Sequence, residues 1–547
     1  MAPALPQPAG SIELQEIERP IDDSTGPAHE ENTEDNYPTK WRLVLITLGL
    51  SLSIFLAALD STIIAQAIPA LTDQFGSISN IAWYGTAYNI TNTAFQSAWG
   101  KAYKYWKLKP VYLSAIVVFE VGNIICAAAQ SSNVVVFGRV VAGIGGGGIM
   151  TGSFIIIAFT AKPQYRAAYM GVLRVTFGCA SVVGPLLGGA LVEYLSWRWT
   201  FWISLPIGAV AAGIMGVFFS QPRAVTPQEA NLTEKLFNMD LNGGVLVAGS
   251  LSCFILAMHY SGPQLWGSAQ VVGSLVGFAG LAILFVVNER LMGSKAMIQG
   301  HLFKKFSIVA NSLFVTFLAG LYFPLLFILP IEFQSVHNNS ASESGVRLIP
   351  LVLGISVFTM VSNGALTWWR HYSPFLVFGA VAGTVGVSLI YSLDATASNG
   401  TWTGLLMVTA VGIGLSLQIP MIANQAAVSA ADIPAATSLT LFMENIGTSL
   451  FVAAGEAAFT NGLISGVQSR LPSVDTSTIV NAGVTQLRSR FPSSELPAIL
   501  AAYLEGCQVS HVVSVACGSA ATLLAFTSAA PGTKQGLQNW WKKSHEG

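Results

Sequence analysis

The chain has 547 residues, of which 52% are hydrophobic and only 10% are charged, whereas a soluble domain carries about 25% charged residues. A mean hydropathy of +0.58 leaves too little polar surface to cover a water-soluble core, so lipid must surround most of the chain. The net charge of −1 gives no case for a nucleic-acid partner, and the five scattered cysteines lack the spacing of a metal site or disulfide framework.

Residues 1–40 differ in composition from the rest of the chain. They contain nine acidic residues against only two basic ones, Arg19 and Lys40, and almost no aromatic residues. Such a segment cannot bury enough apolar surface to fold, so it predicts a disordered cytosolic tail. A second cytosolic tail is expected at residues 531–547.

Fourteen segments are apolar over about the 20 residues that a helix needs to cross a bilayer. They are residues 43–66, 83–100, 111–131, 133–158, 168–192, 200–220, 241–260, 270–288, 308–331, 346–367, 374–393, 402–424, 436–459 and 511–529. Because lipid offers no hydrogen bonds, these spans must be helices or barrel strands. Their length and continuous apolarity exclude barrel strands, so the sequence predicts an all-α membrane protein.

The distribution of Lys and Arg places the N-terminus in the cytosol. The inside loops then carry Lys101, Lys104, Lys107, Lys109, Lys162, Arg166, Arg223, Lys235, Arg290, Lys295, Lys304, Lys305 and Arg370. The short outside loops hold little beyond Arg198 and Arg347. An even number of spans returns the C-terminus to the cytosol. Two glycosylation sequons, at Asn338 and Asn399, both fall outside in this topology.

Asp60 in span 1 and Arg139 in span 4 both lie about six residues from the outer end of their span, so they are at similar depth. Ionisable groups inside a membrane are costly and therefore candidates for function. We expect the two to interact directly or through water. A conformational change that separates them would let Asp60 take a proton, although a static ion pair that fixes helix packing is the alternative.

Spans 2 and 3 carry further polar candidates. Asn89, Asn92 and Gln96 share one helix face, with Tyr84 and Tyr88 nearby. Amides are costly against lipid, so this face lines either the substrate path or another helix. Glu120, in the middle of span 3, is either a second protonation site or a hydrogen-bonded packing residue.

Spans 4 and 5 are rich in glycine. The run that follows Arg139 lacks the Lys-Ser/Thr of a phosphate-binding loop, so close helix packing is the better interpretation. In span 5, Pro185 removes a backbone hydrogen bond, and small residues beside it permit close approach and bending. This conformational motif consists of Gly178, Gly184, Pro185, Gly188 and Gly189. Arg174, earlier in span 5, is expected to extend toward the cytosolic surface.

The second half of the chain holds three acids within or next to spans. Glu444 in span 13 is the deepest of them and is our candidate for binding a proton or cation. Glu332 and Glu456 lie near outer ends and are expected to contact water. Gln418 and Asn424 in span 12 have the same two interpretations as the amides of span 2, substrate path or helix contact.

Four segments resemble the major facilitator superfamily, specifically its fourteen-spanner drug:proton antiporter branch. They are LDSTII at 59–64 followed by AIP at 67–69, GRVVAGIG at 138–145, the glycine-rich 178–189, and WRWTFWISLPIG at 197–208. Further similarity is to fungal efflux pumps for toxins and other secondary metabolites. It is carried by FEVG at 119–122, ESGVRLIP at 343–350 and a long outer loop at 461–510.

This resemblance covers about residues 41–530 and implies a fold of two six-helix bundles, at 41–222 and 301–530, with two linker helices within 223–300. It implies alternating access and proton-driven export of amphipathic small molecules across the plasma membrane, or alternatively the vacuolar membrane. Asp60 and Arg139 would belong to the coupling machinery. No cofactor besides the proton gradient is implied, and we expect a monomer.

The chain also departs from that family's pattern. The loop after helix 2 usually carries an Asp that latches the cytosolic face, whereas this chain has Lys104. Glu444 and Glu456 stand where relatives often carry Gln, which could add protonation sites, and Ser204 replaces a common Asn.

Two other function classes remain. One is a proton-coupled transporter of a siderophore, sugar or amino acid, against which the span 5 motif argues. The other is a non-transporting membrane sensor, which would predict a large soluble signalling domain. No His-Glu-x-x-His, Cys-x-x-Cys or nucleotide-binding motif is found, so an enzyme is not expected.

Overall fold

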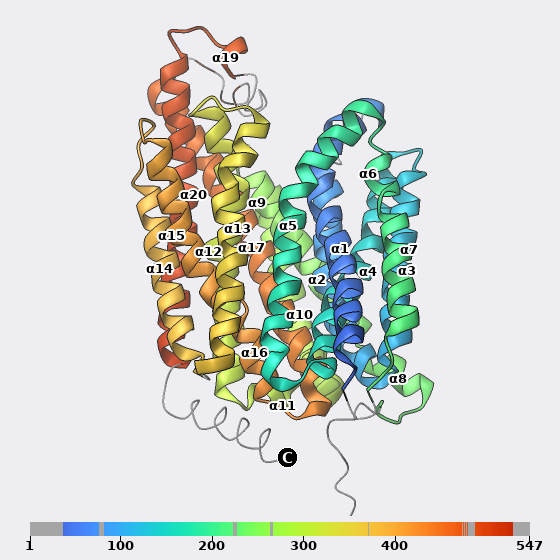
Figure 1. Ribbon diagram of the computed structural model, residues 1–547. Coiled ribbons are helices and arrows are strands. Elements are labelled where there is room, and N and C mark those ends of the chain that lie inside the picture. Colours follow the sequence, from blue (N-terminus) through green and yellow to red (C-terminus); the bar gives the residue numbers. More distant parts are fainter. Residues whose placement is uncertain are drawn as a thin grey trace, which may run out of the picture.

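The computed structural model describes residues 37–75, 81–222, 227–262, 266–369, 371–472, 474, 476, 479 and 487–528, and these are mostly helical (Figure 1). Residues 1–36 and 529–547 of the predicted tails, together with Arg223 and Arg370, lie outside them. Thirteen of the described helices are long and apolar enough to cross a membrane. With α2 (Ile81–Tyr105), whose amides and Lys101 lower its hydropathy, they make fourteen, and the predicted all-α membrane fold is confirmed.

The N-terminal bundle is held together by glycines at helix contacts. It consists of α1 (Lys40–Phe75), α2, α3 (Leu108–Ala127), α4 (Ser132–Thr160), α5 (Pro163–Tyr194), the short α6 (Trp199–Trp202) and α7 (Ser204–Phe218). A Cβ at Gly145 would overlap the backbone of Phe119, so α3 and α4 touch backbone to backbone. The packing interpretation of the glycine run is therefore confirmed.

Helix α5 uses its small residues on two sides. Gly184 and Gly188 lie against Thr62 and Ile63 of α1, within the same bundle. Gly178 instead faces Ser356 in the other bundle, and α5 continues unbroken through Pro185. The helix therefore belongs to one bundle and forms part of its contact with the other.

The C-terminal bundle consists of α12 (Phe306–Ser335), α13 (Ala341–Trp369), α14 (Ser373–Tyr391), α15 (Asn399–Leu417), α16 (Ile419–Ala426), α17 (Ile433–Arg470) and α20 (Leu496–Ser528). Its core packs Phe314 and Leu321 of α12 against Leu376 of α14 and Ile413 of α15. A Cβ at Gly412 would overlap the backbone of α14, so this bundle also relies on glycine for close packing.

Much of the predicted outer loop at 461–510 is helical, which corrects its description as a loop. Helix α17 continues to Arg470 and α20 begins at Leu496, with the short α19 (Leu487–Arg490) between them. Leu463 and Val467 of α17 pack against Ile499 and Tyr503 of α20 in a separate apolar cluster. Polar residues lower the hydropathy of both extensions, so hydropathy alone ended span 13 too early and began span 14 too late.

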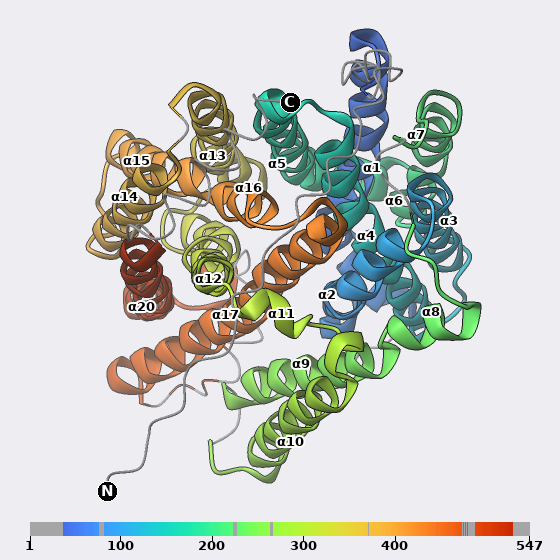
Figure 2. The same cartoon turned by 90° about the horizontal axis from the view of Figure 1, so that it is seen from below.

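Helices α9 (Leu241–Ser261) and α10 (Ala269–Met292) form a hairpin beside α2 and α17 (Figure 2). Val247 and Leu251 of α9 pack against Ile90 of α2 and Phe442 of α17. Valines, leucines and isoleucines of α10 are exposed, as expected of a helix that faces lipid. Lys101 of α2 donates a hydrogen bond at 2.6 Å to the carbonyl of Lys295, which follows α10 in the chain. This bond links the hairpin to the N-terminal bundle.

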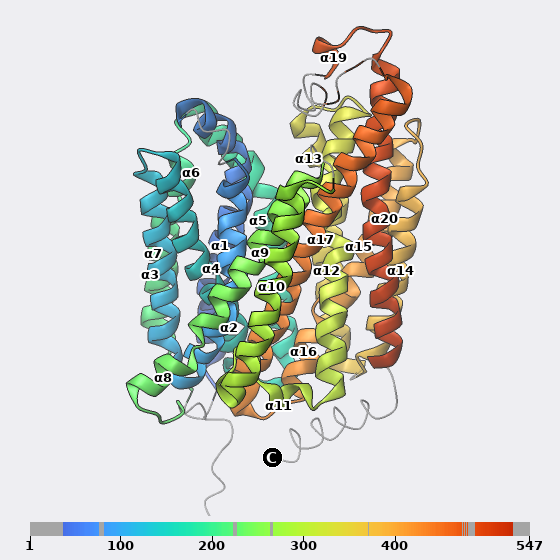
Figure 3. The same cartoon turned by 180° about the vertical axis from the view of Figure 1, so that it is seen from behind.

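The two bundles come together at one end of the molecule and separate toward the other (Figure 1, Figure 3). We call the end at which α1 begins the basal end and the end at which α1 finishes the distal end. The short helices α8 (Leu232–Asn238) and α11 (Gly300–Phe303) lie at the basal end, and α19 lies at the distal end (Figure 1).

Candidate functional site

Asp60 and Arg139 form a buried ion pair between α1 and α4. Arg139 Nη1 donates to Asp60 Oδ2 at 2.6 Å, and the two side chains are 0% and 3% exposed. Arg139 Nε donates to the carbonyl of Tyr84 at 2.9 Å, and its Cζ lies 4.6 Å from the centroid of the Tyr88 ring. The predicted direct interaction is confirmed, and Tyr84 and Tyr88 prove to be its surroundings.

The carboxylate of Asp60 is not fully hydrogen-bonded. Its Oδ1 atom is buried and has no hydrogen-bond partner among the described residues. Buried polar atoms without partners are rare in folded proteins, so this atom invites a chemical explanation. A proton could bind at Oδ1 without breaking the bond that Oδ2 accepts from Arg139.

Glu120 of α3 is hydrogen-bonded to α7, as its packing interpretation expects, and its role as a protonation site stays a prediction. Ser204 Oγ of α7 donates to Glu120 Oε2 at 2.9 Å, which is a packing hydrogen bond. The second oxygen, Oε1, is buried without a partner among the described residues and lies against Gly208. Ser204 therefore holds this acid in place.

Arg174 of α5 joins the two bundles. Its Nη1 and Nη2 donate to Glu444 Oε1 and Oε2 of α17 at 2.9 and 2.6 Å, and its Nε donates to Gln418 Oε1 at 2.7 Å. The expectation that Arg174 extends to the surface was wrong, because its side chain is buried and donates to both carboxylate oxygens of Glu444. Sequence reasoning singled out both residues, but the 270 positions between them hid the pairing.

The polar face of α2 serves partly as a contact between bundles. Asn445 Nδ2 of α17 donates to Gln96 Oε1 at 2.8 Å. Asn92 is half-buried, and Asn89 is exposed. Asn424 is used within the C-terminal bundle, where it accepts from Asn311 at 3.0 Å.

A second ion pair joins the bundles at the basal end. Lys104 Nζ of α2 lies 3.1 Å from Asp432 Oδ1, in the turn (Ala430–Asp432) that precedes α17. His301 Nε2 of α11 lies 3.4 Å from the same oxygen. Lys104 of the N-terminal bundle and Asp432 of the C-terminal bundle therefore form a charged contact between the bundles at the basal end.

Lys104→Asp is expected to weaken this basal contact, because it places two carboxylates side by side. A partly exposed ion pair is worth about 1 kcal/mol or less, so the ratio of basal-closed to basal-open protein should fall by up to about fivefold. Spin labels at Lys107→Cys and Lys304→Cys, both exposed positions, would report the change as a longer distance. Cys179 and Cys253, which are partly exposed, would first be replaced by Ser.

The charge-exchanged double variant Lys104→Asp with Asp432→Lys is the control and should restore the short distance. Unchanged distances in Lys104→Asp would show that the pair does not contribute to basal closure.

Glu332 is buried rather than water-exposed, which corrects the sequence-based expectation. His511 Nε2 of α20 lies 3.0 Å from Glu332 Oε2, and the side chains are 2% and 3% exposed. Glu332 lies near the end of α12, but α20 packs over it. The position of a residue within its own span does not reveal that another helix covers it. Glu456 is exposed on the surface of the protein, and its contact with water stays a prediction.

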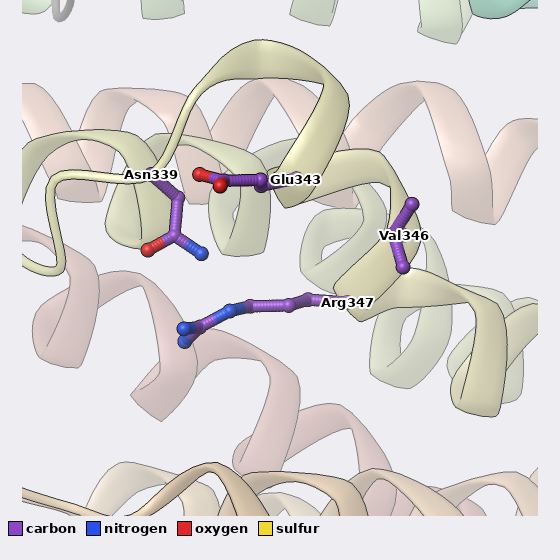
Figure 4. A pocket seen from close by; sticks show the side chains of 4 residues that line it. All are labelled: Asn339, Glu343, Val346 and Arg347. Carbon is purple, nitrogen blue, oxygen red and sulfur yellow. The ribbon is translucent and has the colours of Figure 1, made fainter.

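The sequons lie on exposed residues at the distal end. Asn338 is exposed with a φ of 57°, in the connection between α12 and α13, and Asn399 is the exposed first residue of α15. Beside Asn338, a cavity of about 400 Å³ is lined by Asn339, Glu343, Val346 and Arg347 (Figure 4). The Arg347 side chain extends toward the amide of Asn339 across it (Figure 4).

Comparison with known sequences identifies relatives along most of the chain. A family model described as Major Facilitator Superfamily matches residues 50–452. The MFS-type transporter thnB of Trichoderma harzianum is 40% identical over 489 residues, covering 89% of this chain and 84% of that protein. The probable efflux pump gsfJ of Penicillium aethiopicum is 38% identical over 494 residues, covering 90% and 88%. The MFS-type efflux pump MFS1 of Trichophyton rubrum is 36% identical over 482 residues, covering 88% and 90%.

Solved structures share the fold at low sequence identity. A bacterial homologue of the human lysosomal transporter Spinster, in an inward-facing conformation, has a TM-score of 0.55 at 16% identity and covers 90% of this chain and 98% of its own. The proton:xylose symporter XylE has a TM-score of 0.57 at 13% identity, with 90% and 96% covered.

Proposed function

The chain belongs to the Major Facilitator Superfamily, and we propose that it exports amphipathic small molecules, of the toxin, secondary-metabolite or drug class, in exchange for protons. Two of the relatives above carry the name efflux pump, which supports the outward direction. The proposed location is the plasma membrane, with the basal end in the cytosol.

The observation that carries the proton part of the proposal is the buried pair of Asp60 and Arg139. A carboxylate within the membrane is expensive, and it persists where it is paired or functional. Arg139 belongs to α4 and Asp60 to α1, so a relative movement of these helices changes the distance between the two charges. Protonation of one Asp60 oxygen removes the negative charge that attracts Arg139, and it therefore favours the conformation in which the two helices have moved apart.

The contacts between bundles support alternating access. The pair of Lys104 with Asp432, the pair of Arg174 with Glu444 and the bond from Asn445 to Gln96 all join the N-terminal half to the C-terminal half. The ribbons separate toward the distal end (Figure 1). We assign this arrangement to the outward-facing state of the proposed exporter.

The orientation rests on the positions of the basic residues. Lys107, Lys109, Lys162 and Lys305 lie at the basal ends of their helices. The positive-inside rule assigns such an end to the cytosol. Export then moves substrate from the basal to the distal side.

The proposal is tested by uptake into inside-out vesicles that contain the protein, under an acid-inside pH gradient. A panel of radiolabelled toxins and drugs would be offered, with empty vesicles as the control. Uptake that depends on the gradient and disappears with a protonophore is the expected result.

Absence of gradient-dependent uptake for every member of the panel would count against proton-coupled export. Uptake only under the opposite gradient, with the outside acidic, would instead indicate symport and contradict the direction proposed here.

A further inference from the structure

We propose that Arg174 is the anion-binding group of the substrate site, that the substrates are amphipathic aromatic carboxylates, and that Glu444 occupies Arg174 until substrate replaces it. This inference rests on the proposed export function and names the substrate class of the site.

Arg174 lies where the two bundles meet. Its guanidinium binds both oxygens of Glu444 across the interface, and the two side chains are 8% and 6% exposed. Its Cζ lies 5.4 Å from the ring of Phe154 on α4. A guanidinium in such surroundings requires a negative partner, and the fork geometry suits any carboxylate equally well.

A narrow cavity adjoins the guanidinium but not its present partner. Its lining includes Arg174, Phe177 and Gly178 from α5, and Tyr322, Phe323 and Leu417 from the C-terminal bundle, whereas Glu444 is not part of it. A molecule that enters between the bundles at this point therefore meets a cation and aromatic rings. This arrangement favours an anionic ligand with an aromatic body. A cationic ligand would instead require the carboxylate of Glu444 to face the cavity.

One polar group beside the guanidinium, the Gln418 amide, offers a spare hydrogen-bond donor. Gln418 is fully buried, and while its Oε1 accepts from Arg174, its Nε2 has no partner among the described residues. Nearby, Thr359 Oγ1 already donates to the carbonyl of Gly414 at 3.0 Å. The unpaired N–H of Gln418 lies next to the guanidinium, and a substrate carboxylate bound there would supply the acceptor that this N–H lacks.

The cavity is about 20 Å³, the space of roughly one water molecule, so it must widen to admit a metabolite. Widening is possible along the contact of α5 with α13, where Gly171 faces Asn363 and Gly178 faces Ser356. When a substrate carboxylate takes the place of Glu444, it breaks the charged contact that joins the bundles. Binding of the substrate therefore also breaks the ion pair between Arg174 and Glu444 that joins the two bundles.

The test is equilibrium binding of radiolabelled 2-naphthoate to the purified full-length protein, with methyl 2-naphthoate and 2-naphthylmethylamine as competitors. Glu444→Gln removes the competing charge and should tighten naphthoate binding about tenfold or more. Arg174→Gln should weaken it by a similar factor. Glu456→Gln, an exposed acid on the same helix, is the matched control and should bind as the wild type does.

Arg174→Gln alone strands a buried carboxylate and could prevent folding, so the neutral double variant Arg174→Gln with Glu444→Gln provides the decisive comparison. Loss of naphthoate binding in a folded double variant supports the proposal. Equal naphthoate affinity in wild type and double variant, competition by the amine as strong as by naphthoate, or no binding to Glu444→Gln would overturn it.

The two proposals fail separately. If naphthoate binds as expected but no compound is taken up under a proton gradient, the export proposal fails and the anion site stands. If neutral drugs are exported but naphthoate does not bind, only the anion site fails.

Discussion

Asp60→Asn is expected to abolish gradient-driven uptake into inside-out vesicles while the protein remains inserted in the membrane. The variant keeps an oxygen for Arg139 but can no longer exchange a proton. It also leaves Arg139 buried without a negative partner, and breaking a buried pair in this way costs about 3–5 kcal/mol. We therefore expect a lowered unfolding temperature together with the loss of transport.

A second variant separates coupling from packing. Asp60→Asn combined with Arg139→Gln removes both charges, so it should recover much of the lost stability but none of the transport. Asp73→Asn, an exposed acid on the same helix, should leave both unchanged. Thermal unfolding in detergent and vesicle uptake, at matched expression, provide the two measurements.

Uptake that persists in Asp60→Asn would move the proton site to Glu120 or Glu444. Glu120 has a buried oxygen without a partner, as Asp60 does, whereas both oxygens of Glu444 are occupied by Arg174. Glu120→Gln is therefore the next variant to measure in that case.

Gly145→Val is expected to prevent folding. A Cβ at Gly145 would overlap the backbone nitrogen and Cα of Phe119, and backbone atoms cannot rotate away as side chains do. The helices α3 and α4 would have to separate along their length, which removes far more packing than the about 1–3 kcal/mol of an ordinary overpacked side chain. Size-exclusion chromatography of the solubilised protein should show aggregate rather than a monodisperse peak.

The matched control is Gly189→Ala in α5. No atom lies within 4 Å of a Cβ at that position, and alanine favours a helix over glycine by about 1 kcal/mol. Its chromatogram should resemble that of the wild type. A folded Gly145→Val protein would mean that the close contact of α3 with α4 is not required.

Sequence determined the features that depend on position along one helix. Hydropathy located the spans, because a segment of about 20 apolar residues has few other stable environments than lipid. Distance from a span end placed Asp60 and Arg139 at one depth, and the structure joins them at 2.6 Å. The glycine run indicated close packing because its spacing suited no other chemistry.

Only the tertiary structure decided which faces meet. Arg174 meets Glu444 across 270 positions, and Lys104 meets Asp432 across 328, because the two bundles are brought together by folding and not by local pattern. Glu332 is buried because α20 lies over it. The depth of a residue in the membrane is a property of one helix and can be counted along the chain. The partner of a residue across an interface depends instead on how both helices are rotated about their axes. The packing of the whole bundle determines that rotation.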